Sequence, residues 1–217
     1  MSGPELWIAS NNRRKLVELQ RLLPGGCRLR LQSEAPVAVT VEEDCPDFAG
    51  NAAKKAKALA LAVRAPAIAD DSGLCVDALD GRPGVHSARY GGPGLDDRGR
   101  VELLLAELRE VPPARRGARF VCHVCLVDHR GEVLATFEDD CSGLIANAAR
   151  GERGFGYDPV FVPRDYRRGD AGHDLEPPTF AMLSADRKDA ISHRGKALRR
   201  LARYLIDHPL PPLPQHP

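Results

Sequence analysis

The stretch that decides the fold runs from Ala69 to Gly92 and reads ADDSGLCVDALDGRPGVHSARYGG. The short apolar segment 65–69 before it predicts a buried strand, which leads directly to the adjacent carboxylates Asp70 and Asp71. In open α/β sheets, ligands bind where strands end, at the carboxyl edge. Two acids at that edge are an expected way to hold a hard cation such as Mg²⁺ against a phosphate.

A simpler interpretation of residues 70–73, Asp-Asp-Ser-Gly, is a turn, in which acids and glycine are common without any function. The continuation of the stretch favours a functional site. It adds four more glycines, Pro83 and a basic and aromatic cluster of His86, Arg89 and Tyr90. Packing alone does not explain so many conformationally permissive glycines and so many charged residues in one stretch.

The amino-terminal segment has the layout of a phosphate-binding turn. The apolar run 6–9 predicts a strand, Ser10-Asn11-Asn12 breaks it, and Asn12 is a good N-cap for a helix that ends at 24–26. A strand, a polar turn and a helix start present backbone N–H groups to phosphate. The three cations at 13–15 are unfavourable against the helix dipole unless a ligand is bound there, although a solvated basic turn is the alternative.

Two further patterns place polar groups beside an expected core. The segment 41–44 packs three carboxylates together, which costs repulsion unless a cation is near, although a solvated acidic loop is the alternative. Pro46 then opens a long helix whose apolar stripe should be core, while Asn51 and Lys55 share another face.

The second half of the chain predicts an antiparallel section followed by a last helix. Residues 28–40 offer two weak strands, 101–108 a helix, and 119–128 with 132–140 a hairpin. Cys122 and Cys125 should point to opposite faces of a strand, so we interpret both as free core thiols rather than a redox or zinc motif. Ser192 is a plausible N-cap for the last helix, and the loop 164–180 is an excursion.

The composition excludes several classes of partner. The 217 residues carry a formal net charge of +1, so no global field points to nucleic acid or to a membrane surface. No apolar run approaches the roughly 20 residues of a membrane span, and the first residues lack a signal-peptide pattern. A cytoplasmic location is the default expectation.

Four motifs together resemble the inosine triphosphate pyrophosphatase family, whose members hydrolyse ITP, dITP and XTP. The first is DDSGL followed by G-x-P-G-x-x-S-A-R-Y, and the others are ASNNRRK (9–15), GFGYDPVF (154–161) and ISHRGKAL (191–198). They follow in order over nearly the whole chain. The resemblance implies an α/β fold with a long mixed sheet flanked by helices, and two lobes with a central cleft. We expect one such domain over 1–208, a disordered proline-rich tail over 209–217, and a homodimer.

The resemblance also implies a site. Mg²⁺ would lie on Glu42 and Asp71, with Asp70 as a further candidate and Glu43 second to Glu42, and Asp71 would take the proton from the attacking water. The other residues expected to bind the nucleotide are Ser10, Asn11, Asn12, Lys15, Lys55, Ser72, Phe155, Gly156, Tyr157, Asp158, Lys188, His193 and Arg194. The chain departs from the family at Gly50 and Met182, where acids are usual.

The reaction implied is NTP + H₂O → NMP + pyrophosphate. Two other classes share parts of the pattern. A nucleotide-binding module without catalysis would keep the phosphate and base motifs and lose acids, as at Gly50 and Met182. A Mg²⁺-dependent phosphomonoesterase would share the acidic site but release orthophosphate, so the product distinguishes all three.

Overall fold

The computed structural model describes residues 5–10, 12–23, 28–166 and 177–210. Helices and strands alternate in the first half of the chain, and three strands then follow in succession before the last two α-helices, so the α/β expectation is confirmed. The strands are β1 (Glu5–Ile8), β2 (Arg28–Leu31), β3 (Ala67–Val76), β4 (Gly117–Val127), β5 (Val133–Ile145) and β6 (Phe161–Pro163). The α-helices are α1 (Arg13–Leu22), α2 (Phe48–Val63), α3 (Asp97–Glu107), α4 (Ala185–Ile191) and α5 (His193–Asp207).

The six strands form one mixed sheet in the order β2-β1-β3-β4-β5-β6. β1 pairs in parallel with β2 and β3, whereas β6 pairs antiparallel with β5. The expected hairpin is confirmed, because β4 and β5 are neighbours joined by a short turn in which Asp128 N–H donates to Glu132 O at 2.9 Å. The expectation of a mixed sheet flanked by helices is therefore confirmed.

The chain divides into two compact units that share the long strands. Unit 1 comprises 1–71, 122–139 and 197–217, and unit 2 comprises 72–121 and 140–196. β3, β4 and β5 each contribute residues to both units.

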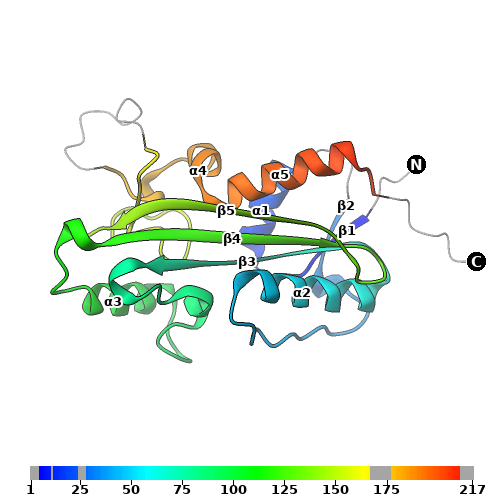
Figure 1. Cartoon of the computed structure of the whole chain (residues 1–217), viewed down its shortest axis with the longest axis horizontal. Helices are drawn as coiled ribbons and strands as arrows, with labels where there is room; N and C mark the ends of the chain where they lie inside the picture. Colours follow the sequence, from blue (N-terminus) through cyan, green and yellow to red (C-terminus); the bar gives the residue numbers. More distant parts are fainter. Residues whose placement is uncertain (1–4, 11, 24–27, 167–176, 211–217) are drawn as a thin grey trace, which may run out of the picture. The chain divides into compact units, whose positions relative to one another are not determined.

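In unit 1 the sheet is covered on both faces, and Figure 1 shows α2 and α5 on different sides of its strands. Ile8 and Ile68 pack in the cluster that contains the buried leucines of α1 and α5. Trp7 and Ala67, their neighbours in the chain, pack in the other cluster with α2. This alternation follows from the two-residue period of a strand, and it assigns every strand residue to one face or the other.

Cys122 and Cys125 confirm that alternation. Cys122 lies in the cluster with α5 and Cys125 in the cluster with α2, and both are buried free thiols. The prediction that they do not form a redox or zinc motif therefore agrees with their geometry. Cys27 lies outside the described residues.

Two predicted helix caps, Asn12 and Ser192, are confirmed, whereas α2 begins at Phe48, two residues after the predicted Pro46. Asn12 caps α1, and Asp47 caps α2 by accepting from Gly50 N–H at 2.7 Å. Of the predicted α2 stripe, Ala52, Ala56 and Leu59 are fully buried. Before α5, Ser192 Oγ accepts from Gly195 N–H at 3.0 Å, which is the expected capping bond.

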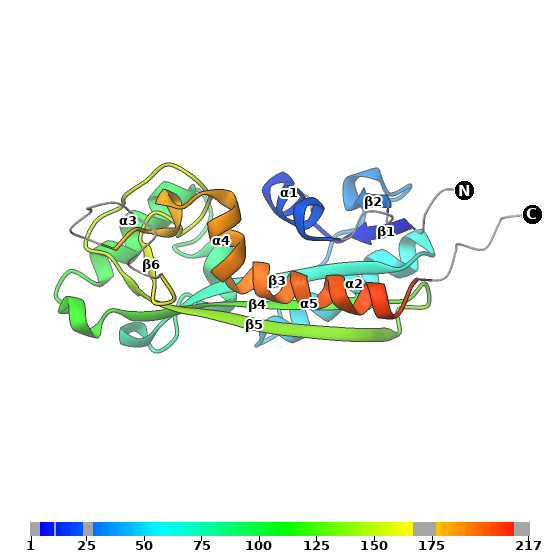
Figure 2. The same ribbon diagram turned by 90° about the horizontal axis from the view of Figure 1, so that it is seen from above.

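Unit 2 has its own apolar core. Leu104 of α3, Phe161 of β6 and Phe180 are all fully buried in one cluster. Figure 2 shows the elements of this unit, α3, β6 and α4, gathered around the ends of β4 and β5 that belong to it. The aromatic rings of Phe120, Phe161 and Phe180 contact one another, with centroids 4.7–6.0 Å apart.

Two expectations about strands were wrong. Between 28 and 40 the structure has one strand, β2, followed by a short 3₁₀ turn at Gln32–Glu34 rather than a second strand. The strand predicted to end at Ala69 continues to Val76, so the DDSGL motif is strand rather than turn. The loop residues 167–176 and most of the proline-rich tail, 211–217, lie outside the described part of the chain. None of the helices described is long and apolar enough to cross a membrane.

Candidate functional site

The two adjacent acids Asp70 and Asp71 lie inside β3 rather than at its end. Because consecutive strand residues face opposite sides of a sheet, the two carboxylates are separated. Asp70 Oδ2 is 2.8 Å from Lys15 Nζ of α1, and Asp71 Oδ1 is 2.9 Å from Lys55 Nζ of α2. Each buried acid therefore has its own lysine, one from each side of the sheet.

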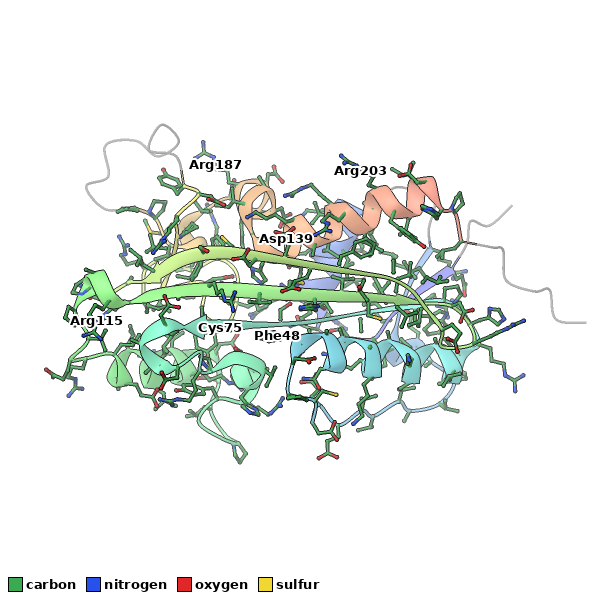
Figure 3. The ribbon with its side chains drawn as sticks, in the orientation of Figure 1. Phe48, Cys75, Arg115, Asp139, Arg187 and Arg203 are labelled. Atoms are coloured by element: carbon green, nitrogen blue, oxygen red, sulfur yellow. The ribbon has the colours of Figure 1, made fainter. Side chains whose placement is uncertain are left out.

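Lys55 is the centre of a charged cluster in unit 1. Its Nζ lies 2.9 Å from Glu43 Oε1 as well as 2.9 Å from Asp71 Oδ1. Asn51, one turn earlier on the same helix and fully buried, donates from Nδ2 to Asp71 Oδ2 at 3.3 Å. The predicted shared face of Asn51 and Lys55 is confirmed, and Figure 3 labels Phe48 at the start of their helix.

The pKa values of Asp71 and Lys55 are both raised, but for different reasons. Burial raises the pKa of Asp71 above its ordinary value, although Lys55 acts in the opposite direction. Burial would lower the pKa of Lys55, but Asp71 and Asp70 outweigh it and hold this pKa above its usual range. Because its pKa is raised, the Asp71 carboxylate would be a stronger base than an exposed carboxylate.

The structure separates the two candidate acids before α2. Glu43 converges with Asp71 on one nitrogen, whereas Glu42 is exposed to solvent. No group of three or more His, Cys, Asp or Glu side chains arranged to hold a metal occurs among the described residues. Mg²⁺ is commonly bound by one or two carboxylates with substrate phosphates completing its shell, so the pair Glu43 and Asp71 fits this ion.

The amino-terminal turn forms as predicted where it is described. Ser10 Oγ accepts from Asn12 N–H at 3.1 Å, and Asn12 Oδ1 accepts from Arg14 N–H at 3.0 Å. Asn12 N–H, one of the backbone donors expected to meet phosphate, thus already donates to a side chain of the turn itself. Asn11 lies outside the described residues.

The segment Gly154–Asp158 forms a tight loop in unit 2, with a positive φ at Gly154 and Gly156. Asp158 Oδ2 accepts from Phe155 N–H at 2.9 Å and from Lys188 Nζ at 2.7 Å. Asp158 is only 3% exposed, so it holds this loop together from inside. Its direct contact with a base stays a prediction.

Two cations, Lys188 of α4 and Arg194 of the carboxyl-terminal motif, lie at the Phe155 ring. Lys188 Nζ is 5.0 Å and the Arg194 guanidinium carbon is 5.5 Å from the ring centroid, distances typical of cation–π contacts. His193 is buried and stacks on Phe120 at 4.7 Å, with the two rings 9° from parallel. The structure thus brings Phe155, Lys188 and Arg194 together from motifs more than 30 residues apart.

Tyr157 and Ser72 complete the placement of the predicted residues. The Tyr157 hydroxyl donates to Ser87 O at 3.1 Å, and burial raises the pKa of this phenol. Ser72 follows Asp71 on β3 and is half-buried. The sequence did not indicate that Ser87 supports the loop at Gly154–Asp158, because Ser87 lies 70 residues from Tyr157 in the chain.

The departures at Gly50 and Met182 have different surroundings. A Cβ atom at residue 50 would lie 2.9 Å from Cys45 Cβ and 3.1 Å from Cys45 Sγ, so Cys45 fills the space that a side chain there would need. Met182 is 37% exposed, and its backbone belongs to a short 3₁₀ turn. Neither position adds an acid to the cluster around Lys55.

Comparison with known proteins gives one consistent result. Residues 6–204 match the model of the Ham1 family. The dITP/XTP pyrophosphatase of Rhodopirellula baltica is 45% identical over 196 residues, which cover 90% of this chain and 89% of that protein. The dITP/XTP pyrophosphatase of Mycolicibacterium paratuberculosis is 46% identical over 200 residues, covering 90% and 93%. A solved HAM1 protein from Coxiella burnetii superposes with a TM-score of 0.80 at 36% identity, covering 94% of this chain and 99% of that one. The chain therefore belongs to the Ham1 family.

Proposed function

We propose that this chain hydrolyses non-standard purine nucleoside triphosphates, namely ITP, dITP and XTP, to the monophosphate and pyrophosphate. Relatives named dITP/XTP pyrophosphatase match about nine tenths of the chain, and this match carries the proposal. Two groups of side chains support it. The cluster around Lys55 suits phosphate and metal, and the ring of Phe155 with its two cations suits a purine base.

At the phosphate end, Lys15 and Lys55 are the cations that would neutralise triphosphate oxygens. Each is now held by carboxylates, and a polyanion would compete for them. Asp71 would accept the proton as water attacks the α-phosphorus and the α–β bridging oxygen leaves with pyrophosphate. Asn51 would keep the Asp71 carboxylate oriented through its 3.3 Å hydrogen bond.

Glu43 and Asp71 are the residues we assign to Mg²⁺, with Glu43 in place of Glu42. The reason is geometric: these two carboxylates converge on one positive charge, the Lys55 ammonium, while Glu42 faces solvent. The ion, when bound, would neutralise charge that develops on the phosphates. Asp70 faces Lys15 from the other side of β3, so we assign it to holding that lysine.

At the base end, Phe155 would stack on the purine, and Arg194 and the region of His193 would donate to it. Hypoxanthine and xanthine carry an acceptor oxygen at C6, whereas adenine carries a donor amine there. A donor placed for the oxygen meets the amine donor to donor, and a buried donor left unpaired costs roughly 1–3 kcal/mol. Two such conflicts would discriminate by about a hundredfold or more.

Guanine shares the C6 oxygen, so it must be rejected at its C2 amine. Asp158 and the Phe155 loop are the nearest candidates. Because Asp158 already accepts from Phe155 N–H and Lys188, the shape of the loop is a stronger candidate than a direct contact with its carboxylate.

The test is a product assay with ITP and Mg²⁺ that resolves pyrophosphate from orthophosphate. Pyrophosphate supports the proposal, orthophosphate indicates a phosphomonoesterase, and binding without product indicates a module without catalysis. Values of kcat/KM for ITP, XTP, GTP and ATP then separate the two specificity arguments. Equal values for ITP and ATP would refute the C6 argument, and equal values for ITP and GTP only the C2 argument.

Two further properties belong to the same proposal. We propose that the chain acts as a homodimer in the cytoplasm, on the free nucleotide pool and without nucleic-acid or membrane partners. Light scattering at micromolar concentration should give twice the chain mass of 23.6 kDa. A mass of one chain would contradict the dimer, and recovery of the enzyme in the membrane fraction of its cells would contradict the location.

A further inference from the structure

The loop at Gly154–Asp158 is held by a side chain that none of the recognised motifs contains. Gly156 N–H donates to Asp97 Oδ2 at 3.0 Å, across 59 residues of chain. Among the other bonds of the loop, Phe155 N–H donates to the loop's own Asp158, Lys188 Nζ donates to the same carboxylate, and the Tyr157 hydroxyl donates to Ser87 O. Asp97 is thus the charged anchor that ties the loop to α3.

Asp97 is available for this bond because its neighbour caps the helix. Asp96 is the N-cap of α3 and accepts from Gly99 N–H at 2.8 Å. Asp97, the first residue of α3, has Arg100 Nη1 3.3 Å from its other oxygen, Oδ1. The two adjacent acids therefore have different partners: Asp96 accepts from the first turn of α3, and Asp97 accepts from the loop.

The start of α3 is itself firmly placed. A Cβ atom at Gly91 would lie 2.5 Å from Leu95 Cδ1 and 2.6 Å from Leu103 Cδ2, so these leucines pack directly on the Gly91 backbone. Leu104, on the inner face of the same helix, is fully buried. A carboxylate on such a rigid element can fix the loop that it binds.

We propose that Asp97 is a positioning residue for the base-binding loop and thereby sets the purine specificity. This inference rests on the proposed function. A hydrogen bond to a carboxylate is stronger than one between neutral groups, so it pre-orders the loop and keeps Phe155 beside Lys188 and Arg194. Without it, binding would have to order the loop, which weakens affinity.

The same bond also affects selectivity. While Asp97 accepts from Gly156 N–H, that donor is withheld from the nucleotide. Every purine carries ring-nitrogen acceptors, including adenine and guanine, so a freed N–H would help the wrong bases as much as the right ones. Loss of Asp97 should therefore weaken ITP binding and narrow the preference for ITP over ATP and GTP.

The experiment compares Asp97→Ala with Asp97→Asn and with the control Asp96→Ala. The Asn side chain keeps an oxygen that can accept from Gly156 N–H, and Asp96→Ala removes a helix cap without touching the loop. We expect Asp97→Ala to raise KM for ITP about tenfold, the size of one partly exposed charge-assisted hydrogen bond, with kcat within about twofold. Asp97→Asn should have a KM for ITP close to that of wild type. Asp96→Ala should lower Tm and leave this KM unchanged.

A second measurement needs no substrate. Hydrogen exchange, followed by mass spectrometry of a peptide spanning 154–158, should be faster in Asp97→Ala than in wild type, and unchanged in Asp96→Ala. Unchanged exchange and KM in Asp97→Ala, or equal effects of the two Ala variants, would overturn the inference. If wild type releases no pyrophosphate from ITP, the proposed function fails, while the exchange result still decides whether Asp97 holds the loop.

Discussion

Replacing Lys55 by Met removes the ammonium that pairs with both Glu43 and Asp71 and keeps a stem of similar length. The two carboxylates then lie close together without the Lys55 charge between them. The site is largely buried, because the side chain of Lys55 is 12% exposed and that of Asp71 is 9% exposed. Breaking a buried pair by removing one partner costs about 3–5 kcal/mol. Glu43 is 30% exposed and can be partly rehydrated, so we expect the low end, about 3 kcal/mol, in metal-free buffer.

The assay is urea unfolding in EDTA and again in MgCl₂. With an m-value of about 2–3 kcal/mol/M, a loss of 3 kcal/mol lowers the midpoint by about 1–1.5 M. Mg²⁺ at 100 times its Kd should restore about 2.7 kcal/mol, because the ion binds only the folded state. Mg²⁺ should stabilise the wild-type protein less than the Lys55→Met variant, because in wild type the ion must displace the Lys55 ammonium.

Lys54→Met is the matched control for this prediction. Lys54 stands next to Lys55 on α2 and pairs with Asp44 at 2.6 Å, but both side chains are largely exposed. Surface pairs of this kind contribute little, so the control should unfold close to wild type in both buffers. Equal midpoint losses in the two variants, or equal Mg²⁺ stabilisation of Lys55→Met and wild type, would refute the reasoning.

Three other outcomes are expected. Asp71→Asn should lower kcat by on the order of 10²–10⁴ while nucleotide binding, measured by calorimetry, largely survives; a near-normal kcat would remove Asp71 from the mechanism. Gly50→Glu should destabilise by about 1–3 kcal/mol in thermal melts because its side chain meets Cys45, and adding Cys45→Gly should recover most of this loss; additive effects would contradict the crowding. Burial and the hydrogen bond to Glu107 raise the pKa of Tyr90 to about 12, so the stability it contributes is present below pH ~10 and lost as pH rises towards 12. Phenolate absorbance at 295 nm, with Tyr90→Phe to assign it, should show the Tyr90 midpoint fall in Glu107→Gln; an unchanged midpoint would contradict the assigned partner.

Regular periodicity accounts for most of what the sequence predicted correctly. The α2 stripe and the alternating strand around Cys122 and Cys125 each repeat with the period of their element, so their buried faces follow from spacing alone. The starts of α1 and α5 were predicted from their N-cap residues. Asn12 and Ser192 accept hydrogen bonds from backbone N–H groups that would otherwise lack a partner in the first turn of the helix.

The extent of β3 could not be predicted in this way. Asp, Ser and Gly are depleted in strands, so the segment 70–73 has the local preference of a turn. In the fold, Lys15 and Lys55 approach from either side of the sheet and neutralise the acids, which lets the strand continue. The lysines lie 55 and 16 residues before their partners, and no local rule connects them.

The sequence could not decide between Glu42 and Glu43 for a related reason. Residues 41–47 form neither helix nor strand, so no period says which side chain turns inward. The geometry favours Glu43, which meets Lys55, while the resemblance had favoured Glu42. The bond from Gly156 to Asp97 is likewise invisible to motif spacing, because it depends on where α3 packs.

The alternation along β3 decides what two neighbouring acids can do. If Asp70 and Asp71 sat in a turn, as their composition suggests, both could reach one ion and share its charge. Within a strand they face opposite ways, and Asp70 is engaged by α1 while Asp71 is engaged by α2. The second carboxylate near Asp71 must then come from another segment, and Glu43 is the acid that the fold brings there. In the proposed mechanism, Asp70 thus holds in place the lysine that would bind phosphate, and Asp71 would accept the proton of the attacking water.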